Sequence, residues 1–79
     1  MTGQIHLATW DHKHGTDHSV HKSYGGAFLQ CVQWAREALE EWGETKDYED
    51  YTDSELISSW PQISGETEFF FIDEMQLKN

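Results

Sequence analysis

Residues 23–43 read SYGGAFLQCVQWAREALEEWG, and this stretch decides the predicted fold. Ser23 is placed to cap the start of a helix, and Gly43 to end it in the left-handed conformation. Between them, apolar side chains recur every three or four residues, the spacing of one helical face. These side chains are Phe28, Cys31, Val32, Ala35, Leu39 and Trp42. We therefore expect one long amphipathic helix, with an acidic side that faces water. The acids on that side are Glu37, Glu40, Glu41 and Glu44.

Strand-like segments flank this helix on both sides. Gln4–Trp10 carries apolar groups at both alternating sets of positions, which is typical of a central strand, whereas Asp17–Tyr24 is polar enough for an edge strand. The segment HKHGT between them predicts a hairpin loop in which Gly15 adopts positive φ. Thr67–Leu77 is the strongest strand candidate. It puts Phe69, Phe71 and Met75 on one face and Phe70 and Ile72 on the other.

The region between the long helix and the last strand has its own signals. Glu44–Tyr51 predicts an acidic loop, and Thr52 with Glu55 forms a capping-box pattern. A short helix from Asp53 to Ser59 should follow, with Pro61 stopping it. The order is ββααβ. We predict a single α+β domain over residues 1–79, with a three-stranded antiparallel sheet in the order 2-1-3 and a long helix across one face.

Charge is distributed unevenly along the chain. The net charge is −10, and residues 35–79 account for all of it, with thirteen acids against Arg36, Lys46 and Lys78. Nine of these acids fall between Glu37 and Glu55. Such like-sign charge repels itself in the folded state, so it is kept either for solubility or for a positively charged partner. Of these two explanations, we favour a positively charged partner.

The predicted docking surface combines carboxylates with two tyrosines that would anchor a bound protein. Its residues are Glu37, Glu40, Glu41, Glu44, Asp47, Tyr48, Glu49, Asp50 and Tyr51. The expected partner is a basic protein of the kind that grips nucleic acid, because spaced carboxylates imitate a row of phosphates. The same charge argues against direct binding of nucleic acid and of anionic membranes. A homodimer that covers exposed aromatic side chains is a further interpretation.

Other chemistry finds weaker support in the sequence. His12 and His14 could contribute to a zinc or nickel site, but Lys13 between them would place a cation beside the metal. Cys31 is a lone cysteine on the apolar face of the helix, so we expect neither a disulfide nor a reactive thiol. No pattern of nucleophile and oxyanion hole is present, and we expect no enzyme and no cofactor. Without a signal peptide or a long apolar run, we expect a cytoplasmic protein.

The hairpin motif suggests a wider resemblance. DHKHGTD, preceded by a strand, resembles a D-H-x-H-G-x-D hairpin of small proteins from phages, prophages and plasmids. In those proteins the hairpin leads into one amphipathic helix and an acidic, aromatic strand. The chain departs from them at its Gly25-Gly26 helix start. In size, charge and domain simplicity it is also similar to small acidic anti-CRISPR and other anti-defence inhibitors, some of which mimic DNA. This resemblance implies an inhibitor acting in a bacterial host, and it assigns no functional residue.

Overall fold

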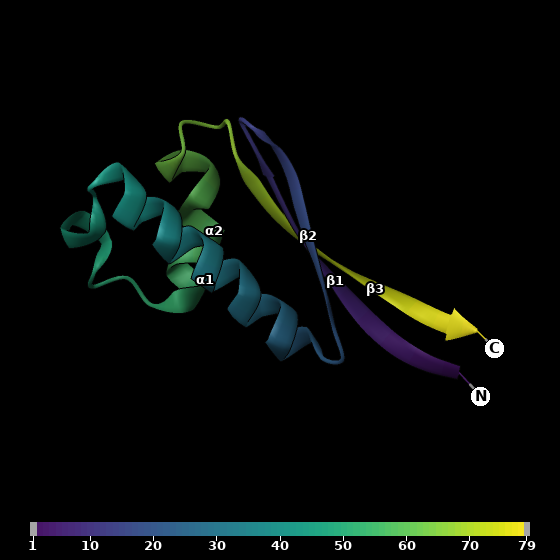
Figure 1. Cartoon of the computed structure of the whole chain (residues 1–79). Helices are drawn as coiled ribbons and strands as arrows, with labels where there is room; N and C mark the ends of the chain where they lie inside the picture. Colours follow the sequence, from purple (N-terminus) through teal and green to yellow (C-terminus); the bar gives the residue numbers. More distant parts are fainter. Residues whose placement is uncertain (1, 79) are drawn as a thin grey trace.

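The computed structural model describes residues 2–78, with side chains for residues 4–76. Its elements are β1 (Thr2–His12), β2 (Gly15–His21), α1 (Tyr24–Trp42), the 3-10 helix η1 (Thr45–Tyr48), α2 (Asp53–Ile63) and β3 (Phe69–Lys78). The strands form one antiparallel sheet in the order β2-β1-β3, and both helices lie on one side of it (Figure 1). The predicted fold class and strand order are therefore confirmed.

The β1–β2 hairpin is tighter than the sequence suggests. His12 pairs with Gly15, so that only Lys13 and His14 form the turn. Gly15 has a φ of 133°, a conformation that a side chain would strain. The predicted strand limits were wrong at this end, because β1 continues through His12 and β2 begins at Gly15. Polar side chains hid this extension, since a two-residue hairpin leaves them exposed without breaking the ladder.

Helix α1 begins and ends as predicted. The Ser23 hydroxyl accepts a hydrogen bond from the backbone N–H of Gly26 at 3.1 Å, and Gly43 adopts a φ of 73°. Gly26 also lets the helix start lie close to β2. A Cβ atom added there would lie 3.4 Å from the Cβ of His21, tighter than most such contacts. Gly26 therefore reflects the close packing of α1 against the sheet, whereas a Cβ atom added at Gly25 would meet only Ser23 Oγ, at 4.0 Å.

Helix α2 confirms the capping box and corrects the predicted helix end. The Thr52 hydroxyl accepts from the N–H of Glu55, whose carboxylate accepts from the N–H of Thr52. Pro61 was expected to stop the helix, but α2 continues to Ile63. Proline removes one N–H from the helix ladder. The last turn nevertheless closes, because the N–H of Ser64 donates to the carbonyl of Trp60 at 2.8 Å.

The core lies between the helices and one face of the sheet. Its fully buried large side chains are Leu39, Leu56 and Trp60, and small residues on α1 let the helix approach the strands closely. Phe70 and Ile57 pack against both groups of buried residues and join them. From the sheet, the core receives Ala8, Trp10, Phe70 and Ile72. These belong to one alternating set in β1 and β3, so the other face of the sheet has no helix on it.

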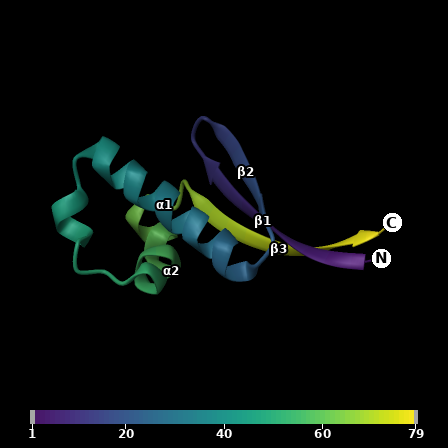
Figure 2. The same ribbon diagram turned by 60° about the horizontal axis from the view of Figure 1, so that its bottom comes forward.

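The molecule is elongated, with extents of 46, 25 and 17 Å. At one end, β1 and β3 run side by side beyond the helices toward the chain termini (Figures 1 and 2). At the opposite end lies the segment that joins α1 to α2, which contains η1 (Figures 1 and 2). We call residues 43–52 the connector. This arrangement separates the connector from the paired ends of β1 and β3.

Candidate protein-docking surface

Seven acids follow the C-terminal half of α1 and the connector, and we call them the acidic end. They are Glu37, Glu40, Glu41, Glu44, Asp47, Glu49 and Asp50. Six are exposed, and Glu44 is half-buried. The fold therefore turns a dense run of acids in the sequence into a cluster at one end of the molecule (Figures 1 and 2). Glu37 to Glu41 span about 6 Å along the axis of α1, at about 1.5 Å per helical residue.

The acidic end coincides with the negative end of the α1 dipole. Glu40 and Glu41 lie in the last turn, which contains no basic residue. The carbonyls of Leu39 and Glu40 accept from the N–H groups of Glu44 and Gly43, which satisfies the backbone there but adds no positive charge. A carboxylate at this position is unfavourable by about 0.3–1 kcal/mol. The placement of these acids therefore lowers the stability of the fold.

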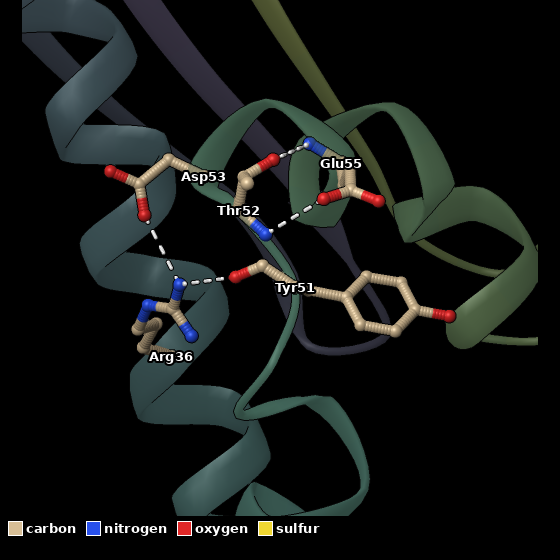
Figure 3. Close-up of polar contacts among 5 residues, drawn as sticks. All are labelled: Arg36, Tyr51, Thr52, Asp53 and Glu55. Carbon is tan, nitrogen blue, oxygen red and sulfur yellow. Dashed lines mark hydrogen bonds and ion pairs between the residues drawn. The ribbon is translucent and has the colours of Figure 1, made fainter.

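Two lysines lie beside this surface, Lys46 in the connector and Lys13 in the hairpin turn, and among the described side chains neither forms an ion pair with one of its acids. Among the side chains of residues 4–76, the ion pairs join His12 to Asp17 and Arg36 to Asp53, and none includes an acid of the acidic end. Arg36 is already engaged, because its guanidinium donates to Asp53 at 3.1 Å and to the carbonyl of Tyr51 at 3.3 Å (Figure 3). Glu37 accepts only a neutral bond, from the side-chain amide of Gln33 at 3.2 Å. The negative field of the acidic end therefore remains.

The start of α2 fixes the far side of the connector. Arg36 ties Tyr51 and Asp53 to α1, while Thr52 and Glu55 close the capping box beside them (Figure 3). Hydrogen bonds from the backbone and hydroxyl of Thr52 lower the pKa of Glu55. Glu55 thus stays ionised as a structural cap. The connector is held at both ends, so its acids are presented on a defined backbone.

The two predicted tyrosine anchors have a structural role in the connector. Tyr48 and Tyr51 are half-buried and pack edge to face, with ring centroids 5.2 Å apart. Both pack against the core around Leu39 and Leu56. They attach the connector to the helices and leave only part of each ring on the surface. The sequence could not separate these two roles, because a tyrosine among acids satisfies both.

Beside the acidic end lies a cleft, which the sequence did not predict. Its volume is about 250 Å³. Its walls come from the β1–β2 turn, the end of α1, the connector, the end of α2 and the segment before β3. The lining residues are Lys13, Trp42, Glu44, Ile63, Ser64, Thr67 and Glu68. Trp42 stacks on Trp60, with centroids 5.4 Å apart, yet it remains 40% exposed. Glu68 is only 4% exposed and accepts from the indole N–H of Trp10 at 3.1 Å.

Trp42 and Glu68 are therefore the residues that sequence reasoning missed. Trp42 was placed on the buried stripe of the helix, whereas α2 covers only one side of its ring. Glu68 precedes β3, and no local pattern signals that its carboxylate turns toward Trp10. The cleft brings the exposed indole of Trp42 together with two acids, Glu44 and Glu68, and with one cation, Lys13. Such a combination suits one basic side chain, through cation–π and charge interactions.

The hairpin histidines are engaged within the hairpin itself. His12 lies 2.9 Å from Asp17 through Nε2, and its Nδ1 accepts from the backbone N–H of His14 at 3.3 Å. Both ring nitrogens of His12 therefore already have partners. Within the part of the chain that the structure describes, no three His, Cys, Asp or Glu side chains are arranged to hold a metal ion together.

Cys31 lies in the core, as its position on the helix predicts. It is fully buried against Ala8 and Ala27. Burial raises the pKa of its thiol to about 11, so the reactive thiolate does not form at neutral pH.

Comparison with known proteins gives no match to a family model, to a curated protein or to a solved structure. None of the described helices has the length and apolar character needed to cross a membrane. The evidence for a docking surface therefore comes from the geometry and electrostatics of this chain alone.

Proposed function

We propose that the chain is a non-enzymatic binding protein that docks its acidic end on a basic surface of another protein. The observation that carries this proposal is the position of the acids. They gather at one end, lack ion pairs among the described side chains, and include Glu40 and Glu41 at the unfavourable end of a helix dipole. Solubility alone would be served equally well by acids at favourable positions.

The physical mechanism is electrostatic attraction followed by close contact. A coherent negative field steers a basic partner toward the surface and speeds association, and this effect falls as salt increases. Arg and Lys side chains arranged to grip nucleic acid would meet carboxylates in place of phosphates. The partner class that fits is thus a nucleic-acid-binding protein. Under the resemblance described above, it would be a defence effector in the cytoplasm of a bacterial host.

The cleft supplies the apolar component that charge alone lacks. A basic side chain of the partner would lie on the exposed face of Trp42, with Glu44 and Glu68 near its charged group. Cation–π contacts contribute about 0.5–1 kcal/mol at exposed sites and more when desolvated. Tyr48 and Tyr51 would add the exposed parts of their rings. An inserted Arg or Lys would share the cleft with Lys13, so its attraction to the Trp42 ring and to the two carboxylates must exceed its repulsion from Lys13.

A capture experiment tests this function. The immobilised chain is exposed to bacterial lysate at low and high salt, beside a Glu40→Gln/Glu41→Gln variant and a Glu66→Gln/Glu74→Gln control. Both variants lose the same charge, but Glu66 and Glu74 lie outside α1 and the connector. A basic protein should be captured at low salt, lost at high salt, and weakened only by the acidic-end variant. Equal weakening by both variants, or capture indifferent to salt, would refute the docking role.

A further inference from the structure

The face of the sheet that carries no helix is unusually apolar for a surface of a single copy. We call it the open face. Its described residues are Ile5, Leu7, Thr9, Asp11, Thr16, His18, Val20, Phe69, Phe71, Asp73 and Met75. Val20 is 61% exposed, Phe71 49% and Met75 48%. Contiguous apolar patches of several hundred Å² on a monomer mark interaction sites.

We propose that a second copy of this chain covers the open face, through sheet-on-sheet packing about a twofold axis. A sheet with apolar side chains on both faces is stable when both are covered, and the helices cover only one. In a twofold contact the same patch must complement itself. Apolar side chains on all three strands meet this requirement, because each copy offers the other a similar surface.

The open face carries few charged side chains among its described residues, which favours an apolar contact over a charged partner. Its described acids are Asp11 and Asp73, and Thr9 is hydrogen-bonded to His18 at 3.1 Å. The remaining acids lie mainly on the helical side and at the acidic end. Two copies packed sheet to sheet would lie about 10 Å apart at the strands, with their helices outside. Screening over about 8 Å then weakens repulsion between the two acidic ends.

The available area lies at the lower limit for a specific interface and therefore fits a weak dimer. Strands of 11, 7 and 10 residues cover about 450 Å² in projection, at about 3.3 Å per residue and about 4.8 Å between strands. Two copies packed on this face would together bury about 900 Å² of projected area, without counting the extra area of the protruding side chains. Specific interfaces begin near about 1,000 Å². We therefore infer a reversible dimer whose population rises with concentration.

Sedimentation over a concentration series tests this inference, with Val20→Lys and Phe71→Lys as disrupting variants. Leu29→Lys is the matched control, because Leu29 is 60% exposed on α1, away from the open face. All three substitutions replace exposed side chains, and circular dichroism verifies that each variant folds. The wild type and Leu29→Lys should sediment as dimers at high concentration, and Val20→Lys and Phe71→Lys as monomers.

Two results would overturn the dimer. One is a wild type that stays monomeric throughout the series. The other is a dimer that survives both Val20→Lys and Phe71→Lys, since it would use a strand edge or another surface. High salt also separates this inference from the docking function. The dimer should persist or strengthen as salt increases, because apolar burial drives it, whereas binding at the acidic end should fade. The failure of one proposal therefore leaves the other standing.

Discussion

Neutralising two acids at the end of α1 should stabilise the protein. In the Glu40→Gln/Glu41→Gln variant, two charges leave the last turn of a helix that has no basic residue there. Each contributes about 0.5 kcal/mol of unfavourable interaction with the dipole. Both also lie three or four residues from Glu37 on the same helix, spacings at which like charges cost about 0.3 kcal/mol per pair. The expected gain is about 1.5 kcal/mol.

Urea unfolding followed by tryptophan fluorescence measures this gain. The Glu66→Gln/Glu74→Gln control removes the same charge elsewhere and should change stability by less than about 0.5 kcal/mol. The melting temperature of the acidic-end variant should rise by about 6–12 °C, given about 4–8 °C per kcal/mol for a domain of this size. The advantage should shrink in about 1 M salt, where the screening length is about 3 Å. A gain no larger than that of the control, or a loss of stability, would refute the electrostatic reasoning.

Four further predictions concern the scaffold that presents the acidic end. Thr52→Ala should lower the free energy of unfolding by about 1 kcal/mol in urea titrations, because it removes the α2 cap; an unchanged value would contradict the capping box. Folding lowers the pKa of Glu55 from its ordinary value of 4.5. The ionised carboxylate therefore stabilises the fold fully above pH 4.5, and this stabilisation is lost as the pH falls through the folded-state pKa. Glu55→Gln should therefore differ from wild type at neutral pH and converge with it in acid, and a constant difference across an acid titration would count against this linkage. The Cys31 thiol, with a pKa of about 11, should react with a thiol reagent at pH 8 only after unfolding, and rapid labelling of the native protein would contradict its burial. Leu56→Ala should lower the free energy of unfolding by about 2–5 kcal/mol and leave little folded protein by circular dichroism. A small decrease would mean that the core collapses into the cavity that the substitution creates.

Local signals predicted the architecture well because most of them report backbone chemistry. The Ser23 cap, the left-handed Gly43 and the capping box at Thr52 each depend on a few neighbouring residues, and each is present. The sheet order followed from topology rules that restrict short α+β chains. The end of α2 was missed because proline removes one hydrogen bond without preventing the next turn, which Trp60 and Ser64 close.

The site was only partly accessible to sequence reasoning. The run of acids was visible, but its placement at the end of the molecule follows from where α1 stops and how the connector turns back. Tyr48 and Tyr51 pack into the core as well as reaching the surface, since their surroundings come from both helices. Trp42 and Glu68 meet at the cleft from positions far apart in the sequence, and long-range proximity of this kind has no local signature.

The most direct test of the account is chemical-shift mapping of the folded chain with an arginine-rich peptide at low and high salt. The backbone amides from Glu37 to Asp50 should shift at low salt, together with the Trp42 indole N–H, and the shifts should disappear at high salt. Shifts spread evenly over the molecule, or centred on the open face, would contradict a negative field concentrated at the acidic end.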